Sequence, residues 1–469
     1  MKLLHLLTSL PRNKVFGKTL VEVKGVSEDS RQVSKGYLFV AVPGLMVDGH
    51  GFINKAIGKG AKTIVGEKDY QDLNIPKGIT YVKVKNSRKY FGILASRFYG
   101  NPSKKLKVIG VTGTKGKTTT CHLIYHILTN TGNKSGLVSS IEAKIGNKSY
   151  DTGLHVTSPD PITLNKFLSK MVDEDCKYAV IEVSSHGIDQ KRIAGINFEA
   201  GVLTNIAPEH LDYHKTFENY KETKLSFIKS AKYQVIAPKA TKLNILTGEF
   251  NNLNVEAAIE AVKYCGVDRD RAIKTLRTFR LPEGRMMKVK NDNGVEIIID
   301  FAHTPSSLEA VLKHLKKQKT KNQKLIAIFG CASERDDSKR PVMGEISAKL
   351  ADISIFTAED PRKENVEKII SEMFLGALKV KNVSEVNTIN YHTTVYGSYE
   401  KKHYILRIPE RGEAISFAIQ KIAKKGDIIA ILGKGHERSM AYNGVEYPWS
   451  DKKAVEYALK EKVLTIQRT

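Results

Sequence analysis

Residues 107–120 read KVIGVTGTKGKTTT, and this stretch predicts the fold at the centre of the chain. Its first six residues are mostly apolar and β-branched, which is typical of a buried strand. A glycine-rich turn follows, and Lys117 then begins a segment in which Leu123, Ile124, Ile127 and Leu128 recur at helical spacing. The sequence therefore predicts a strand, a tight turn and a helix in succession.

The turn has the composition of a phosphate-binding loop. Gly113 and Gly116 allow backbone N–H groups to close around phosphate oxygens, and the helix that follows adds a favourable dipole. We expect Lys117 to contact the β- and γ-phosphates of ATP and the Thr118 hydroxyl to bind Mg²⁺. The strict GxxxxGK[ST] pattern has glycine where this chain has Val111. A glycine-rich turn could also lack a ligand, but the strand–turn–helix context favours the ATP site.

Short β-branched runs alternate with helical stretches on both sides of this loop. The clearest predicted strands are residues 108–112, 178–183, 201–205, 297–301, 325–329, 353–357 and 427–432. This alternation predicts an α/β protein whose centre is a doubly wound parallel sheet. Breaks at 99–103 (YGNPS) and 281–284 (LPEG) predict three domains, 1–98, 99–281 and 282–469.

A carboxylate and two histidines follow the loop along the chain. Residues 181–187 read IEVSSHG, a strand that ends at Glu182, and residues 204–214 read TNIAPEHLDYH. Mg²⁺ on ATP needs a protein carboxylate opposite the loop threonine, which makes Glu182 the candidate ligand. A Glu at a strand end is otherwise more often a surface or capping group. Lys224 follows in the segment YKETK, residues 220–224.

The loop GTKGKT, with EVSSHG, NIAPEHLDYH and YKETK, resembles the central domain of the Mur ligases, the ATP-dependent amino-acid ligases of peptidoglycan precursor synthesis. Within that family the chain is similar to members that add the third residue of the stem peptide. Residues 28–33 (EDSRQV), 36–41 (GYLFVA) and 44–50 (GLMVDGH) resemble the family's UDP-binding domain, and 300–305 (DFAHTP) its third domain. The resemblance implies an N-terminal UDP-binding α/β domain, a central P-loop domain and a C-terminal Rossmann-like domain that binds the amino acid.

The resemblance implies ATP and two Mg²⁺ ions as cofactors. Thr118 and Glu182 would hold one ion, and Glu182, His210 and a carbamylated Lys224 would hold the other. Lys117, Lys224, His210 and Arg285 would carry the catalysis. The positions that match the family's ATP site are Gly113, Thr114, Lys115, Gly116, Lys117, Thr118, Thr119, Asn251, Asn254 and Asp300.

The resemblance also implies UDP-N-acetylmuramoyl-L-alanyl-D-glutamate as a substrate. The family usually has asparagine where this chain has Val156, and it has a much longer excursion where residues 239–248 form a bridge here. The stretch PEGRM, residues 282–286, also departs from the family's PGRME. The positions that match the nucleotide-sugar site are Glu28, Ser30, Leu45, Met46, Val47, Thr157, Ser158, Ser184, Gln190 and Arg192.

The motif for the incoming amino acid is matched less closely. Residues 358–362 read AEDPR, where members that add diaminopimelate carry DNPR. Arg362 would bind the distal carboxylate that meso-diaminopimelate has and L-lysine lacks, which favours the former as the acceptor. Glu359 and Asp360 raise the local negative charge, which would suit an ammonium group. The matching acceptor positions are Arg335, Glu359, Asp360, Pro361, Arg362, Gly433 and Glu437.

Composition excludes several other classes of protein. The 75 Lys and Arg residues exceed the 50 Asp and Glu residues by 25, but they are scattered, so a lysine-rich surface is favoured over nucleic-acid binding. Four distant cysteines exclude a disulfide scaffold and a structural zinc site. No segment approaches the roughly 18 apolar residues of a membrane span. The first residues, MKLLHLLTSLPRNK, lack a signal-peptide cleavage site, so we expect a cytoplasmic protein. We also expect a monomer with no nucleic-acid or membrane partner.

The implied reaction is ATP-dependent amide formation through an acyl phosphate. A version of the same ligase that adds L-lysine stays open. Folylpolyglutamate synthetase shares the loop, but the EDSR and GKGHE segments, residues 28–31 and 433–437, argue against it. A basic nucleic-acid-binding ATPase and a catalytically inactive relative of the ligases also stay open.

Overall fold

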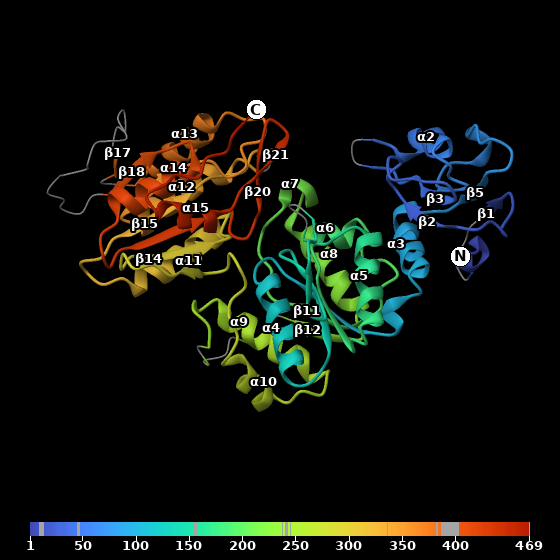
Figure 1. Ribbon diagram of the computed structural model, residues 1–469, viewed down its shortest axis with the longest axis horizontal. Helices are drawn as coiled ribbons and strands as arrows, with labels where there is room; N and C mark the ends of the chain where they lie inside the picture. The colour runs from blue at the N-terminus through green and yellow to red at the C-terminus, as the bar shows by residue number, and fades with distance from the viewer. Residues whose placement is uncertain are drawn as a thin grey trace. The chain divides into compact units, whose positions relative to one another are not determined.

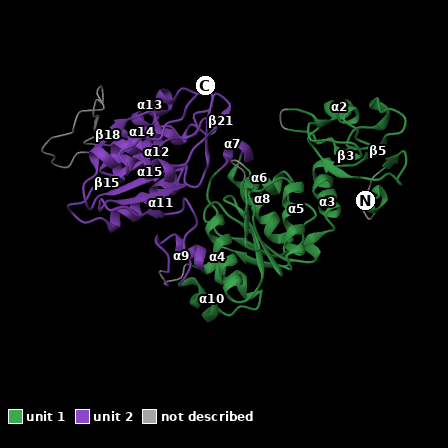
Figure 2. Ribbon diagram, in the orientation of Figure 1, with its two compact units in different colours: residues 1–209, 216–239, 256–277 green, residues 210–215, 240–255, 278–469 purple. Residues whose placement is uncertain are grey.

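The computed structural model describes residues 1–8, 14–44, 47–153, 157–236, 238–239, 243, 245–334, 336–380, 383–385 and 403–468. They form two compact units (Figure 2). The first unit comprises residues 1–209, 216–239 and 256–277, and the second comprises 210–215, 240–255 and 278–469. The first unit holds two main sheets and the second holds one (Figure 1). The α/β architecture is confirmed, and the domain boundaries after residues 98 and 281 stay a prediction.

The N-terminal sheet is a small, mostly parallel sheet with the strand order β1-β5-β4-β3-β2. Only β1 runs antiparallel to its neighbour. Its strands are β1 (Lys14–Phe16), β2 (Gly25–Ser27), β3 (Tyr37–Val40), β4 (Thr63–Gly66) and β5 (Thr80–Lys83), and its helices are α1 (Leu3–Leu7), α2 (Ile53–Gly58) and α3 (Ser87–Phe98).

The central sheet has the order β12-β11-β6-β10-β7-β8-β9, and its first five strands are parallel. Its strands are β6 (Lys107–Thr112), β7 (Ser135–Val138), β8 (Ala143–Ile145), β9 (Lys148–Tyr150), β10 (Tyr178–Glu182), β11 (Phe198–Leu203) and β12 (Tyr233–Ile236). The helices of this region are α4 (Lys117–Asn130), α5 (Pro161–Asp173), α6 (Ser185–Asp189), α8 (Phe217–Ser230), α9 (Asn251–Lys263) and α10 (Arg269–Leu276). The strand, turn and helix predicted from residues 107–120 are confirmed as β6, the loop and α4.

The second unit holds a sheet of order β13-β14-β19-β15-β16-β18-β17, in which only the edge strand β13 is antiparallel. Its strands are β13 (Met287–Val289), β14 (Glu296–Asp300), β15 (Leu325–Phe329), β16 (Ile353–Phe356), β17 (Val383–Glu385), β18 (His403–Arg407) and β19 (Ile428–Leu432). The unit also contains the hairpin β20 (Ser439–Tyr442) and β21 (Val445–Pro448), and the helices α7 (Leu211–His214), α11 (Pro305–Gln318), α12 (Lys339–Leu350), α13 (Val366–Ala377), α14 (Arg411–Phe417) and α15 (Asp451–Ala458).

Alternate residues of the strands in this sheet face two separate apolar cores. In β15, Leu325 and Phe329 pack with α11, α12 and α13, whereas Ile326 and Ile328 pack with α14 and α15. Burial on both faces explains why these strands read as continuous apolar runs rather than alternating ones. All seven strands predicted from such runs are present, with the largest shift at β11, which begins at Phe198 rather than at residue 201.

No helix in the described part of the chain is both long and apolar enough to cross a membrane.

Candidate active site

Two glycines give the phosphate loop its shape. Gly113 follows β6 at φ +152°, and a Cβ there would lie 1.9 Å from the Thr204 hydroxyl oxygen. Gly116 precedes α4 at φ +81°, in the left-handed region that other residues rarely adopt. The loop is therefore a compact turn that ends at the N-terminus of a 14-residue helix, which is the arrangement that binds phosphate.

Lys117 lies across this loop. Its Nζ donates to the carbonyl oxygens of Gly113 and Thr114, at 3.0 Å each. The ammonium group is thus held next to the loop by backbone oxygens, where it can exchange them for phosphate oxygens. The predicted position of Lys117 at the start of α4 is confirmed.

Residues after β11 hold the loop from its other side. The Asn205 side-chain oxygen accepts from the Lys115 backbone N–H at 2.9 Å, and the Thr204 hydroxyl donates to the Lys115 carbonyl at 2.6 Å. The Thr114 hydroxyl lies 3.0 Å from the Tyr220 hydroxyl and accepts from the Ala207 N–H at 2.9 Å. The sequence analysis did not assign Thr204, Asn205 or Tyr220. For Thr204 and Asn205 the available signal was a pair of polar residues directly after a buried strand, whereas Tyr220 lies on α8.

Thr118 and Glu182 meet as the sequence predicts. The Thr118 hydroxyl donates to Glu182 Oε1 at 3.0 Å, and Glu182 Oε2 accepts from the Ser140 N–H at 2.8 Å. Glu182 is 1% exposed, so it is a buried carboxylate beside a phosphate loop. A hydroxyl and a carboxylate oxygen are hard ligands that fit one Mg²⁺. Among the described residues, no three His, Cys, Asp or Glu side chains gather as a metal site.

Lys224 is buried beneath the same loop, on α8. Its Nζ donates to the Gly113 carbonyl at 2.9 Å and to the Thr112 hydroxyl at 3.3 Å, and it lies 4.7 Å from the centre of the Tyr220 ring. Burial, assisted by the charge of Lys117, holds the pKa of Lys224 well below its usual value. Burial therefore favours the neutral amine over the ammonium form more strongly than at an exposed lysine. His210 precedes α7 at φ +56° and belongs to the second unit.

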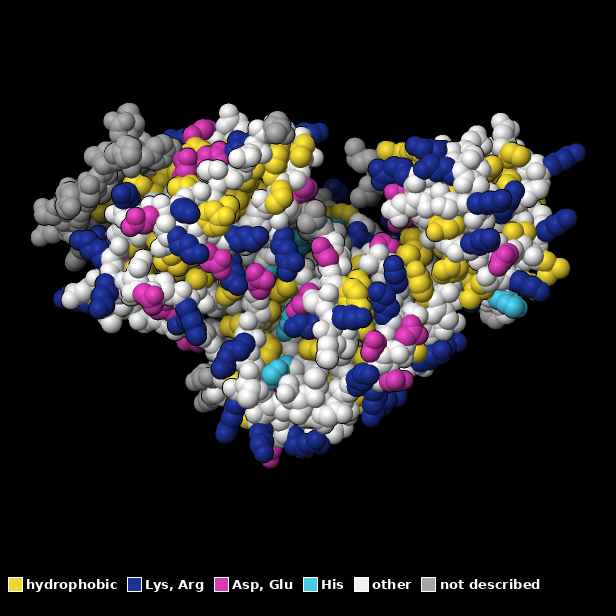
Figure 3. Space-filling view, viewed as in Figure 1, with side chains coloured by type: hydrophobic (Ala, Val, Ile, Leu, Met, Phe, Trp, Pro, Cys, Tyr) yellow, Lys and Arg dark blue, Asp and Glu magenta, His cyan; other side chains and the backbone are white. Residues whose placement is uncertain are grey.

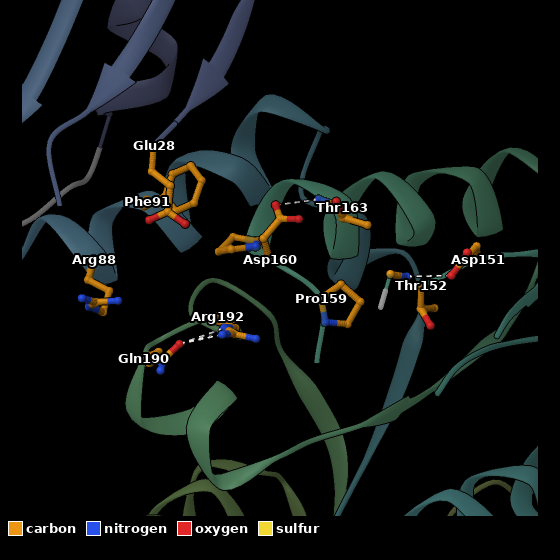
Figure 4. Close-up of a pocket in the computed structure, with 12 residues that line it drawn as sticks. Glu28, Arg88, Phe91, Asp151, Thr152, Pro159, Asp160, Thr163, Gln190 and Arg192 are labelled. Atoms are coloured by element: carbon orange, nitrogen blue, oxygen red, sulfur yellow. Dashed lines mark hydrogen bonds between the residues drawn. The ribbon is translucent and has the colours of Figure 1, made fainter. Parts of the chain in front are cut away.

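A cavity of about 420 Å³ in the first unit is lined by three of the residues predicted for the nucleotide-sugar site, Glu28, Gln190 and Arg192 (Figure 4). Arg192 donates from Nε and Nη2 to the Gln190 side-chain oxygen, at 3.1 and 2.7 Å. Burial raises the pKa of Glu28, although the charges of Arg88 and Arg192 lower it. The cavity therefore combines two guanidinium groups, Arg88 and Arg192, with three carboxylates, Glu28, Asp151 and Asp160.

A chain of hydrogen bonds joins this cavity to the strand that carries Glu182. Arg192 Nη1 donates to the Ser158 carbonyl at 2.7 Å, and the hydroxyls of Ser158 and Ser184 lie 3.1 Å apart. The Ser158 hydroxyl also donates to the Glu182 carbonyl at 3.2 Å. The structure thus brings together Ser158, Ser184, Gln190 and Arg192, which the sequence separates by up to 34 positions.

Ser30, Val47 and Thr157, which are also predicted for the nucleotide-sugar site, do not line this cavity. Ser30 is buried in the turn region after β2, Thr157 is half-buried, and Val47 is 59% exposed. Leu45 and Met46 lie outside the described residues, as does Val156.

In the second unit, Asp300, predicted for the ATP site, ends β14, and Arg285, predicted to be catalytic, lies just before β13. Asp300 Oδ2 accepts from the Met286 N–H at 2.7 Å, and the Arg285 guanidinium lies 4.7 Å from the centre of the Phe301 ring. Nearer the start of the unit, Asn254 donates to the Asn251 side-chain oxygen at 2.9 Å. The predicted ATP residues Asn251 and Asn254 are therefore in direct contact.

The predicted acceptor residues lie at the carboxyl ends of β16 and β19. Asp360 Oδ1 accepts from Lys434 Nζ and from the Ala441 N–H, at 3.0 Å each, and Lys434 also pairs with Glu437 at 2.5 Å. Lys434 is completely buried, and Glu437 and Asp360 raise its pKa although burial lowers it. Sequence reasoning missed this lysine, which lies between two of the predicted residues.

Glu359 differs from its neighbour. It is 5% exposed, and its Oε2 has no hydrogen-bond partner among the described residues. A Cβ on Gly433 would lie 2.7 Å from that oxygen. Burial raises the pKa of Glu359 to about 7. The motif therefore carries less negative charge than the sequence implies, because Lys434 neutralises Asp360 and burial favours the protonated form of Glu359.

Arg362 ends this segment at φ +48°, and its N–H donates to the Ala441 carbonyl at 2.9 Å. Its Nη1 lies 3.7 Å from Glu334 Oε2, and its side chain is 24% exposed, so it can reach a ligand. The Pro361 carbonyl accepts from the Ser333 hydroxyl at 2.6 Å. Arg335, the remaining predicted acceptor residue, lies outside the described residues.

Three family models match the chain: the Mur ligase family catalytic domain over residues 22–99, the Mur ligase middle domain over 111–263 and the Mur ligase glutamate ligase domain over 284–435. The UDP-N-acetylmuramoyl-L-alanyl-D-glutamate--2,6-diaminopimelate ligase of Phocaeicola vulgatus is 34% identical, with 97% of this chain and 99% of that protein covered. The enzyme of the same name from Bacteroides fragilis is 35% identical, with coverages of 97% and 98%. A solved structure bearing that enzyme name matches with a TM-score of 0.61 and 26% identity, over 98% of this chain and 99% of the other.

Proposed function

The chain belongs to the Mur ligase family, and from that premise we propose that it joins meso-diaminopimelate to UDP-N-acetylmuramoyl-L-alanyl-D-glutamate at the expense of ATP. An oxygen of the D-glutamyl carboxylate attacks the γ-phosphorus, ADP leaves, and an acyl phosphate forms. The amine of the acceptor then attacks the acyl carbon, phosphate leaves, and the nitrogen loses a proton. The product is an amide, and the work of the protein is positioning and charge stabilisation.

The observation that carries the proposal is the buried Glu182 facing Thr118 beside a glycine-shaped phosphate loop. Residues 113–119 would bind the phosphates, with Lys117 neutralising the charge that develops on transfer. Asn251, Asn254 and Asp300 would contact the nucleoside. Arg285 would complete the charge stabilisation.

Thr118 and Glu182 would hold one Mg²⁺, which supplies Lewis-acid stabilisation of phosphate oxygens. A second ion would use Glu182, His210 and Lys224. The low pKa of Lys224 supports this role, because an uncharged amine can add to CO₂. A nitrogen–carbon bond forms, the nitrogen loses one proton, and the neutral amine becomes an anionic carbamate that could bind a metal.

The cavity lined by Glu28, Gln190 and Arg192 supports binding of the dipeptide end of the nucleotide sugar. Arg192 is suited to a carboxylate, since a guanidinium presents paired N–H donors. The remaining predicted contacts are Ser30, Leu45, Met46, Val47, Thr157, Ser158 and Ser184.

Arg362 supports meso-diaminopimelate as the acceptor, because it is a partly exposed guanidinium beside the predicted amine-binding residues. Glu359, Asp360, Pro361, Gly433, Glu437 and Arg335 would complete the acceptor site. L-Lysine is the second candidate, and it lacks the distal carboxylate that Arg362 would bind. We further propose that the chain acts as a cytoplasmic monomer in cell-wall precursor synthesis.

A nucleic-acid-binding ATPase has less support. On the face shown in Figure 3, Lys and Arg side chains are spread between acidic and neutral ones rather than gathered in one stripe. Proteins that bind nucleic acid concentrate their positive charge along the path of the backbone.

The test is phosphate release from ATP in the presence of the UDP-linked dipeptide, with meso-diaminopimelate and L-lysine supplied in separate reactions. We expect turnover that depends on diaminopimelate. Turnover with lysine alone would retain the ligase and overturn the role of Arg362. Turnover with a folate and glutamate, or hydrolysis stimulated by DNA or RNA, would overturn the ligase assignment.

A further inference from the structure

Arg411, the first residue of α14, is a buried cation to which the proposed chemistry gives no part. It is 1% exposed. Its Nε and Nη2 donate to the two carboxylate oxygens of Asp451 at 2.7 Å each, and Trp449 Nε1 donates to the same carboxylate at 2.9 Å. Asp451 begins α15 and is fully buried. This bidentate pair fixes the plane of the guanidinium group.

The guanidinium group also reaches two backbone carbonyls. Nη1 donates to the Ala358 oxygen at 3.2 Å, and Nη2 donates to the Leu432 oxygen at 3.0 Å. Ala358 directly precedes Glu359, and Leu432 directly precedes Gly433. One side chain therefore ties together the two segments that carry the proposed acceptor residues, and it uses four of its hydrogen-bonding directions to do so.

The two carbonyls belong to segments that do not pair with each other in the sheet. Ala358 follows β16 and Leu432 ends β19, and β15 lies between these two strands. Directly after β15 comes Gly330, where a Cβ would lie 2.3 Å from the Thr357 oxygen and 2.8 Å from the Glu359 nitrogen. The segment before Glu359 therefore passes close over the end of β15, and strand pairing does not by itself set its distance from residue 433.

A buried ion pair is an expensive way to stabilise a fold. The cost of removing both charges from water offsets most of their attraction, so well-packed apolar side chains would stabilise the unit about as well. What the pair adds is orientation, since a guanidinium held by Asp451 can bond to carbonyls only in one geometry.

We propose that Arg411 is a positioning residue for the acceptor amino acid, setting the spacing between residues 359–362 and residues 433–437. This inference rests on the proposed function, because it takes those segments as the acceptor site. Arg411 touches no reacting atom and acts through the two carbonyls that it holds.

The first test is Arg411→Lys, which keeps the charge but has three donors and no planar fork, so it cannot make the bidentate pair with Asp451 and both carbonyl bonds together. We expect the KM for diaminopimelate to rise between about 10- and 100-fold, as for other small displacements of binding groups. The KM values for ATP and for the UDP-linked dipeptide should stay within about twofold of wild type. Asp451→Asn, which weakens the same geometry, should change the same KM by a smaller factor.

Val455→Ala is the matched control. Val455 lies on α15 with Asp451 and is fully buried, so its truncation loosens the same helix without touching the guanidinium. It should lower the melting temperature and leave the KM for diaminopimelate unchanged. Equal effects of Arg411→Lys and Val455→Ala on that KM, or equal rises in all three KM values for Arg411→Lys, would overturn the proposal.

Amide hydrogen exchange tests the geometry without any turnover. In Asp451→Asn and in Arg411→Lys, exchange should accelerate in residues 358–362 and 433–437 relative to residues 325–329 of β15. Unchanged exchange in both segments would overturn the proposed positioning role of Arg411. Failure of the proposed function would be distinguishable, because the wild-type protein would then show no acceptor-dependent turnover. The exchange measurement would still decide whether Arg411 holds the two segments.

Discussion

The glycine-rich loop of the first unit and the two proposed acceptor segments of the second unit, residues 359–362 and 433–437, are built in opposite ways. The loop presents backbone groups shaped by Gly113 and Gly116, together with one cation, Lys117. The acceptor segments depend on buried ionic side chains, Lys434 and Arg411, that hold other groups in place. A site made from one short stretch of backbone is readable in sequence, whereas a site made from buried charges brought from distant strands is not.

Lys117→Met should have the largest effect, because it removes the charge of the loop and keeps the length of the side chain. We expect kcat to fall by roughly 10²–10³-fold, as for the loss of one group that stabilises transition-state charge. Steady-state phosphate release measures this. Lys107→Met, at the exposed start of β6, is the control and should retain wild-type turnover. Wild-type turnover of Lys117→Met would indicate an inactive loop and a different ATP site.

Lys224→Arg should lower turnover almost as much as Lys117→Met. Arginine is a cation that cannot form the carbamate, so the proposed anionic metal ligand is lost, and turnover should fall by about 10²-fold or more. Depleting CO₂ and bicarbonate should slow the wild-type enzyme and leave the residual rate of the variant unchanged. Wild-type turnover that is independent of CO₂ would rule out the carbamate.

Arg362→Lys should separate the two regions, because it alters the proposed acceptor site and leaves the phosphate loop unchanged. Losing a bidentate guanidinium–carboxylate contact costs about 1.5–3 kcal/mol, so the KM for diaminopimelate should rise by about 10- to 100-fold. The KM for ATP should not change. Parallel titrations of both substrates provide the measurement, and an equal rise for ATP would mean that Arg362 acts on the whole unit.

Glu359→Gln should have the smallest effect on turnover and a clear effect on pH dependence. Burial raises the pKa of Glu359 to about 7, and the charge of Asp360 raises it as well. The cations Lys339, Lys434 and Arg411 lower this pKa by less. As pH rises from 6 to 8, Glu359 loses its proton and should bind an ammonium group several-fold more tightly. Calorimetric titration of the acceptor should show this in wild type and a flat profile in the variant.

The same residue affects stability with a defined sign. Its pKa in the folded chain lies above the usual 4.5, so the folded state binds the proton more tightly than the unfolded state. The free energy of unfolding should therefore fall as pH rises from about 4.5 through 7, by on the order of 3 kcal/mol. Urea unfolding of Glu359→Gln between these pH values should show a smaller decrease. An identical decrease in the free energy of unfolding for the wild type and the variant would show that a group other than Glu359 causes it.

The local sequence pattern was enough to predict the strands and the glycine-rich loop of this chain. The run at residues 107–112 and the two glycines after it predict β6 and the loop, because strand formation and left-handed backbone are properties of adjacent residues. The pairing of Thr118 with Glu182 was also predictable, since a loop threonine and a strand-end carboxylate have one common use. The predicted roles of the individual residues stay predictions.

Only the tertiary structure decides the charge at the acceptor segments. The sequence shows Glu359 and Asp360 as two adjacent acids. The fold places Lys434 against Asp360 and buries Glu359, whose Oε2 has no hydrogen-bond partner in the described part of the chain. Nor does sequence spacing reveal that Arg411 and Asp451, 40 positions apart, meet beneath two strand ends. Electrostatic energies depend on distance and burial in three dimensions, which composition and periodicity do not encode.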